Sequence, residues 1–468
     1  MNMMNKELED DLGKPWQVER YEELSVKNES VYFDVGDFEE IIDYYVHQGS
    51  YKTAILVNDY AVRLHPSAIP LLLKKAQLLA SVNKEDHALS ILTEVETMEP
   101  SNNDIFLTKG AIYSQLRNYE KAIEEYNKAI FGSEEPDYVY CNIAFEYENL
   151  GNFDKTLEYL SKALDVNPDN DLAIYEAAYC FDLLSLTEEG ISFFHRLIDR
   201  NPYSSEAWFN LGVSYINAGL YEKAIDALDY ALAIDEDHEH SWFHKGYVLH
   251  LMERYTEAIE AFDHSIMEDE TDPMKYYYIG ECYEKLSDYS QARKLYNKTI
   301  EMDPAITDAW VGLGVCDLED DMPIAALQYF LKGVELDPEN VSYLTLLANT
   351  YFTLGKKKEG CSTYERALEL DPADLETWVE YAEVLASIKL LDKATHIIRT
   401  GLETIPGNTT LIYRLSAYLF LDGKSHEALY HLEEALSSEY HGHTDILDRY
   451  PQLMLYPSFM DAIERYRL

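Results

Sequence analysis

The chain has 468 residues, of which 47% are hydrophobic, and its 38 Lys and Arg against 86 Asp and Glu give a formal net charge of -48 at pH 7. This hydrophobic content excludes a disordered chain. The charge makes nucleic acids and anionic membranes poor partners, because both require a basic surface that displaces counterions. Two interpretations of the charge stay open: it keeps an elongated protein soluble, or it attracts a basic partner.

Residues 1–34 form an acidic N-terminal segment that is interrupted by Pro15. We expect either irregular structure here or a short helix docked on the structure that follows. The segment lacks the apolar core of a signal peptide, and no stretch of the chain has the roughly 18 apolar residues of a membrane-spanning helix. The five cysteines are an odd number without a CxxC pair, which favours a reducing compartment. We therefore predict a cytoplasmic protein.

A pattern with a period of 34 residues begins at Val35 and continues to Gly442 without insertion or deletion. Each repeat contains two amphipathic stretches with helical spacing. The eighth position of the repeat is small everywhere except at Ile42, and the twentieth is small in every repeat. Packed helices approach to about 8–10 Å, and a larger side chain at the contact would hold them apart. The pattern therefore predicts helical hairpins stacked into one solenoid. The predicted repeats begin at Val35, Ile69, Asn103, Asp137, Asp171, Ser205, Glu239, Pro273, Thr307, Val341, Leu375 and Thr409.

Two further features recur at this period. Bulky rings occupy one column, as at Phe262, Tyr296, Phe330 and Tyr364. Glycine stands at the turn inside several hairpins, where a left-handed backbone conformation costs glycine little. These turn glycines are Gly49, Gly151, Gly219, Gly355 and Gly423.

The combined motif resembles the tetratricopeptide repeat (TPR) family, whose pattern has an aromatic residue, Leu-Gly, Tyr, Ala, an aromatic residue, Ala and Pro. The segments that match best are Trp208-Leu211-Gly212-Tyr215-Ala224-Leu228-Ala231, Trp310-Leu313-Gly314-Ala326-Phe330-Pro338 and Tyr276-Gly280-Tyr283-Ala292-Tyr296-Pro304. The resemblance covers residues 35–442 as twelve consecutive repeats. It implies an all-α fold, a right-handed α-α superhelical solenoid of tetratricopeptide helical hairpins, with the first helix of each hairpin lining the concave face.

The 34-residue pattern ends at Gly442. Ile446, Leu447 and Tyr450 suit a short helix that Pro451 terminates, and Phe459 and Ile463 lie on one face of a final helix. Residues 443–468 are therefore predicted as C-terminal capping helices that cover the last repeat.

The resemblance implies that positions 2, 5, 9, 12 and 13 of each repeat face the concave surface. In the central repeats these positions carry aromatic and apolar side chains in addition to those of the core. Exposed apolar surface of this kind marks binding sites, although a tightly wound superhelix could instead bury the rings against each other. The predicted partner-binding residues are Tyr138, Phe145, Tyr175, Tyr179, Phe209, Ile216, Phe243, Tyr247 and Tyr277. The lining towards the ends is acidic, at Glu39, Asp43, Glu281, Glu284, Asp308, Glu376 and Glu383.

The sequence thus predicts a non-catalytic protein-protein interaction scaffold or adaptor, without a cofactor. It would bind a peptide or helix of a partner protein in this aromatic groove, with the acidic ends selecting a basic flank. The fifth position of the repeat is never basic, which argues against the carboxylate clamp of the chaperone-binding members of the family. The sequence leaves the oligomeric state open.

Two alternatives remain. One is a structural protein that assembles with itself through its end repeats. The other is a metal-binding protein, because His240 and His244 are spaced four apart with His238 and His250 nearby. Enzyme motifs fail on inspection. The Gly423-Lys424-Ser425 segment lacks the upstream glycine of a phosphate-binding loop, so no catalytic residues are assigned.

Overall fold

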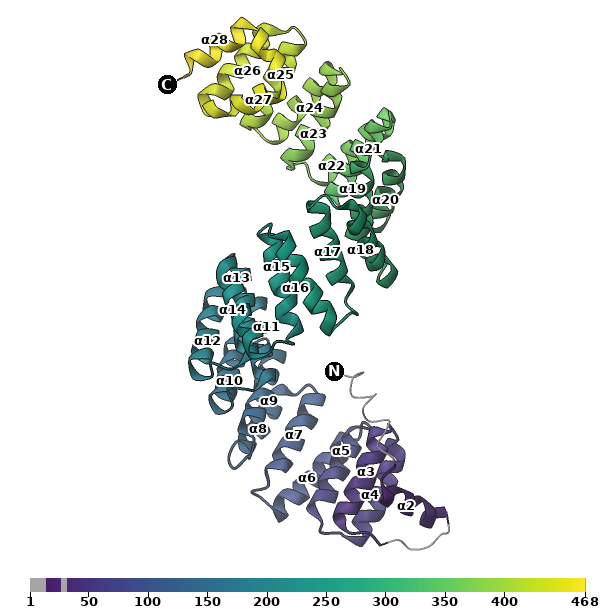
Figure 1. Ribbon diagram of the computed structural model, residues 1–468. Helices are drawn as coiled ribbons and strands as arrows, with labels where there is room; N and C mark the ends of the chain where they lie inside the picture. The colour runs from purple at the N-terminus through teal and green to yellow at the C-terminus, as the bar shows by residue number, and fades with distance from the viewer. Residues whose placement is uncertain (1–13, 27–31, 468) are drawn as a thin grey trace. The chain divides into compact units, whose positions relative to one another are not determined.

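The computed structural model describes residues 14–26 and 32–467, and every regular element within these ranges is a helix (Figure 1). Residues 1–13 and 27–31, which belong to the predicted N-terminal segment, and residue 468 lie outside the described residues. The chain divides into two compact units, the N-terminal unit Met1–His238 and the C-terminal unit Glu239–Leu468. The predicted all-α fold, a solenoid of helical hairpins, is confirmed.

In its described residues, 14–26 and 32–238, the N-terminal unit contains one helix followed by six hairpins, each made of two consecutive helices. Its helices are α2 (Trp16–Val26), α3 (Val35–His47), α4 (Tyr51–Leu64), α5 (Ile69–Ala80), α6 (Glu85–Met98), α7 (Asn103–Gln115), α8 (Tyr119–Ala129), α9 (Pro136–Asn149), α10 (Phe153–Val166), α11 (Asp171–Leu183), α12 (Thr187–Arg200), α13 (Ser205–Asn217) and α14 (Tyr221–Ile234).

The C-terminal unit also contains six hairpins, followed by short helices. Its elements are α15 (Glu239–Leu251), α16 (Tyr255–Glu268), α17 (Pro273–Lys285), α18 (Tyr289–Met302), α19 (Thr307–Glu319), α20 (Pro323–Leu336), α21 (Val341–Thr353), α22 (Lys357–Leu370), α23 (Leu375–Ser387), α24 (Leu391–Thr404), α25 (Thr409–Leu421), α26 (Ser425–Ser438), η1 (Tyr440–Gly442), α27 (His443–Arg449), η2 (Pro451–Leu455) and α28 (Pro457–Arg465).

The glycines of the eighth position face a large side chain of the second helix in the same hairpin, which is a ring in every case except Gly212, where it is Leu228. A Cβ atom added to Gly246 would lie 2.7 Å from the ring of Phe262, and one added to Gly280 would lie 2.9 Å from the ring of Tyr296. Both rings are buried. The eighth position is therefore small because a large side chain from the second helix fills the space beside it.

Each end of the chain adds helices to its neighbouring hairpin. Val18 of α2 is fully buried and shares a core with Phe38 and Ile41 of α3. In the C-terminal unit, the ring of Phe459 in α28 lies 5.1 Å from that of Phe420 in α25. None of the helices in residues 14–26 and 32–467 combines the length and the apolar character that crossing a membrane requires.

The turn inside every hairpin has a left-handed residue at the fifteenth position of the repeat. The five glycines expected there have φ between 67° and 81°, and the other seven turns hold non-glycine residues with φ between 54° and 63°. The following N–H closes a Schellman turn, as where Arg254 donates to the carbonyl of Leu249 at 2.9 Å. These seven residues are Asn83, Arg117, Ser185, Glu253, Ser287, Asp321 and Lys389.

Replacing Glu253 with glycine is expected to raise the free energy of unfolding by about 0.5–1 kcal/mol, because a left-handed conformation strains a residue that has a Cβ atom. Glu253 has φ 59° and is exposed. Chemical denaturation of Glu253→Gly and Glu253→Ala tests this, since only glycine relieves the strain. Equal stability of the two variants would show that the turn is not strained.

Candidate functional site

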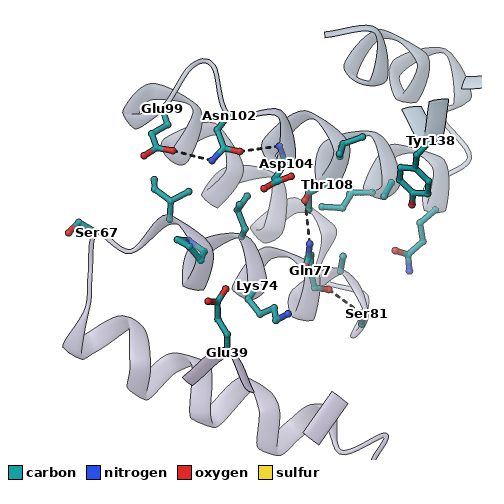
Figure 2. A pocket seen from close by; sticks show the side chains of 18 residues that line it. Glu39, Ser67, Lys74, Gln77, Ser81, Glu99, Asn102, Asp104, Thr108 and Tyr138 are labelled. Carbon is teal, nitrogen blue, oxygen red and sulfur yellow. Dashed lines mark hydrogen bonds between the residues drawn. The ribbon is translucent and has the colours of Figure 1, made fainter. Parts of the chain in front are cut away.

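A cavity of about 910 Å³ opens on the first helices of the second and third hairpins in the N-terminal unit (Figure 2). Its walls include Leu73 and Gln77 of α5, Leu107 of α7 and Tyr138 at the start of α9. These residues stand at positions 5, 9, 5 and 2 of their repeats, which are positions predicted to line the concave surface. Of them, only Tyr138 was among the predicted binding residues. The other three lie in the second and third repeats, outside the central repeats to which the prediction was confined.

The lining of this cavity combines apolar side chains with polar ones that bond to one another (Figure 2). Asn102 donates its side-chain amide to Glu99 at 3.0 Å, and Gln77 donates to the hydroxyl of Thr108 at 3.5 Å. Lys74 is 2.5 Å from the carboxylate of Asp43, so its charge is already compensated. The cavity therefore offers amides and hydroxyls to a polar chain, and its lysine is not free for an acidic ligand.

Three of the predicted residues are the most exposed of the nine. Tyr138, Tyr175 and Tyr179 are 52%, 66% and 46% exposed. Tyr138 belongs to α9 and the other two lie one helical turn apart on α11. Phenol rings at this exposure give a partner a large and rigid contact area.

The helices that carry these tyrosines contain no Lys, Arg or His, and neither does α13. Glu148 of α9 and Glu176 of α11 have no ion-pair partner in the described part of the chain. Burial raises the pKa of Glu176, and the negative charge of Glu148 raises it further. The charge of Glu148 therefore reaches Glu176, and both carboxylates belong to the helices that carry the tyrosines.

The other predicted residues of the N-terminal unit are less exposed. Phe145, Phe209 and Ile216 are half-buried. The ring of Phe209 lies 5.2 Å from that of His238. These three side chains thus combine contacts within the unit with some remaining open surface.

The predicted aromatic residues of the C-terminal unit pack around one shared ring. Phe243, Tyr247 and Tyr277 are all half-buried. Their rings lie 5.9, 5.5 and 5.2 Å from the ring of Tyr278, which the sequence prediction omitted. Tyr278 stands at the sixth position of its repeat, which was not among the positions assigned to the concave face. Each of these residues is therefore partly exposed, as an open groove requires, and partly buried against a neighbouring ring.

Several predicted acidic residues already have partners inside the protein. Glu383 pairs with Arg414 at 3.1 Å and also with Arg449 of α27. Glu284 accepts a hydrogen bond from the hydroxyl of Tyr296 at 2.8 Å, and Tyr343 donates to Asp308. These carboxylates therefore already have ion-pair or hydrogen-bond partners within the unit. The sequence alone does not reveal these contacts.

The histidines considered as metal ligands have separate partners. His240 lies 2.9 Å from Glu239, and His238 lies 3.0 Å from Glu206. His250 is 3.5 Å from Glu281 and 3.4 Å from the sulfur of Cys282. Over residues 14–26 and 32–467, no group of three or more His, Cys, Asp or Glu side chains is placed to hold a metal ion.

Comparison with known structures finds tetratricopeptide proteins of low sequence identity. The crystal structure of YrrB, described as a TPR protein with an unusual peptide-binding site, is 21% identical, covers 42% of this chain and 97% of its own, and has a TM-score of 0.35. The crystal structure of MamA is 20% identical, covers 42% and 95%, and has a TM-score of 0.30. The Cut9 and Hcn1 hetero-tetramer of the APC/C is 14% identical, covers 85% and 92%, and has a TM-score of 0.43. No curated protein matches the sequence significantly.

Family models described as tetratricopeptide repeat match six segments of the chain. One model matches residues 138–170 and 205–238, a second matches 104–130, 239–272 and 341–374, and a third matches 276–305. Each segment overlaps one of the helical hairpins. Members of this family are typically non-catalytic scaffolds for protein-protein interaction. By its motif, its hairpins and these matches, the chain belongs to the tetratricopeptide repeat family.

Proposed function

We propose that this protein is a non-catalytic interaction scaffold that binds a basic peptide or helix of a partner protein on the face formed by α9 and α11. The observation that carries the proposal is the exposure of Tyr138, Tyr175 and Tyr179 on two helices that contain acidic residues and no basic ones. Exposed aromatic residues are frequent anchors of interfaces.

A basic ligand suits this face for two reasons. Lys and Arg side chains pack their aliphatic stems on tyrosine rings and place their charge near the ring faces. Glu148 and Glu176 then gain a counter-charge that they lack within the unit, which is most favourable for Glu176 because burial already opposes its ionised form. An acidic ligand would instead bring like charges together.

The cavity beside Tyr138 extends the proposed site. Its amide and hydroxyl groups suit the main chain of an extended peptide, whose N–H and C=O groups need partners when they leave water. The predicted cytoplasmic location is part of this proposal and is supported by the five free cysteines.

The test is a display library of random peptides, selected against the full chain. We expect enrichment of Lys and Arg, and we expect the joint replacement Tyr175→Ala and Tyr179→Ala to weaken the selected peptides by about tenfold or more. The matched control replaces Tyr203 and Tyr230, which are 81% and 57% exposed in the same unit, with alanine. Helix content by circular dichroism should be the same for both double variants.

Selected peptides without a basic preference would contradict the proposed partner chemistry. Equal losses of affinity in the two double variants would contradict the proposed position of the site. Loss of helix content in Tyr175→Ala with Tyr179→Ala would show that these rings belong to the core.

A further inference from the structure

We propose that the C-terminal unit contains an arginine-selective subsite formed by Tyr247, Tyr277, Tyr278 and Glu281. Its ligand is the guanidinium group of an arginine in a partner protein, so the inference rests on the proposed scaffold function. It concerns different helices, α15 and α17, and a different chemistry from a general basic preference.

The three tyrosines form an aromatic corner. The ring of Tyr278 lies 5.5 Å from that of Tyr247 at an interplanar angle of 67°, and 5.2 Å from that of Tyr277 at 64°. Rings at such steep angles meet edge to face, so the planes of Tyr247 and Tyr277 are not parallel to that of Tyr278. All three residues are half-buried, so none of them belongs wholly to the core.

Buried rings support two of the three tyrosines. Phe262 of α16 stacks on Tyr278 with a centroid distance of 5.7 Å and an interplanar angle of 7°, and Phe262 itself is fully buried. Tyr277 also packs on the buried ring of Tyr296, at 6.0 Å. Rings fixed in this way lose little conformational entropy when a ligand binds.

Glu281 supplies negative charge one turn along α17 from Tyr277 and Tyr278. Its carboxylate is 3.5 Å from His250, whose pKa is lowered by burial, so this contact provides little positive charge at neutral pH. Burial raises the pKa of Glu281, Lys285 opposes the rise and Asp308 of α19 adds to it. A hydrogen bond from Tyr277 to the carboxylate also opposes the rise. The carboxylate is thus only partly compensated, and an external cation would stabilise its ionised form.

Arginine fits this combination better than lysine or a metal ion. A guanidinium group is planar, stacks on aromatic faces and donates two parallel hydrogen bonds to one carboxylate. An ammonium group is more strongly hydrated and has no face to stack. A metal ion would need further oxygen, nitrogen or sulfur ligands, and the described residues bring no group of three such side chains together.

The experiment uses three fluorescein-labelled peptides with a repeated Arg-Gly-Ser unit, the same unit with lysine, and the same unit with citrulline. Their binding to the full chain is measured by fluorescence anisotropy. The chain carries Tyr175→Ala and Tyr179→Ala, so that the face proposed in the N-terminal unit does not contribute. We expect the arginine peptide to bind about tenfold more tightly than the lysine peptide, and the citrulline peptide to lose binding.

Single substitutions test whether the arginine peptide binds at the proposed subsite. Glu281→Gln should weaken the arginine peptide by about tenfold, whereas Glu369→Gln, which removes the same charge from an exposed residue of α22, should change it by less than about twofold. Tyr247→Leu keeps the bulk of the side chain, removes an aromatic face and should lower the preference for arginine over lysine.

Equal affinities for the arginine and lysine peptides, no measurable binding, or equal losses in Glu281→Gln and Glu369→Gln would overturn the subsite. Such results would leave the tyrosine face of α9 and α11 to be judged by its own library test. Conversely, a failed library test together with arginine-selective binding here would retain the subsite and contradict only that face.

Discussion

Replacing Lys275 with alanine is expected to lower the free energy of unfolding of the C-terminal unit by about 3–5 kcal/mol. Lys275 is fully buried on α17. Its ammonium group is 2.6 Å from the carboxylate of Glu239 and donates to the carbonyl of Asp269 at 2.7 Å and to that of Ser265 at 3.2 Å. The truncation would leave Glu239 and two carbonyl groups without this donor, which is the costly way to break a buried ion pair.

Urea unfolding followed by circular dichroism measures this effect. Lys393→Ala, which removes an exposed lysine of α24, is the matched control and should change the free energy of unfolding by less than about 0.5 kcal/mol. Similar unfolding midpoints for the two variants would mean that the buried contacts of Lys275 contribute little to stability.

Replacing Phe330 with alanine should cost about 3–5 kcal/mol, because its fully buried ring fills the space between the helices of one hairpin. The same contact predicts an effect from the opposite side. A Cβ atom at Gly314 would lie 2.6 Å from this ring, so Gly314→Ala should overpack the hairpin by about 1–3 kcal/mol.

The two changes are expected to be non-additive. Phe330→Leu makes room beside Gly314, so Gly314→Ala should cost less in that background than in the wild type. A double-mutant cycle from denaturation measures the difference. Ile324→Ala on α20, where the side chain is 72% exposed, should have little effect and serves as the control. Full additivity would show that the ring of Phe330 does not limit the size of the eighth position.

The fold was predictable because its constraints recur at a fixed spacing. Close helix contacts require small residues beside large side chains, and a column of such pairs is visible in the sequence alone. The predicted repeat starts coincide with helix starts at, for example, Val35 and Ile69, whereas α9 begins at Pro136 instead of the predicted Asp137. Proline favours the first position of a helix, which explains the difference of one residue.

The turns were only partly predictable. A glycine such as Gly219 indicates a left-handed backbone conformation, but Glu253 and Lys389 adopt the same conformation without being glycine. The Schellman hydrogen bonds and the packing of the two helices determine the backbone at these positions. Residue preference is a weaker influence than these tertiary constraints.

The candidate site was predictable where it depends on repeat geometry. The positions assigned to the concave face include Tyr138, Tyr175 and Tyr179, which are the most exposed of the nine predicted residues. Specific pairs were not predictable, because Arg449 reaches Glu383 from 66 positions further along the chain. Such contacts depend on side-chain placement that no periodic pattern encodes.

The central claim is that α9 and α11 form the surface that a basic partner contacts. The most direct measurement is photo-crosslinking of a selected basic peptide to the full chain, with the attachment sites identified by mass spectrometry. We expect the crosslinks to fall on α9 and α11, around Tyr138, Tyr175 and Tyr179. Crosslinks that fall only on the second helices of the hairpins, such as α10 and α12, would contradict this account.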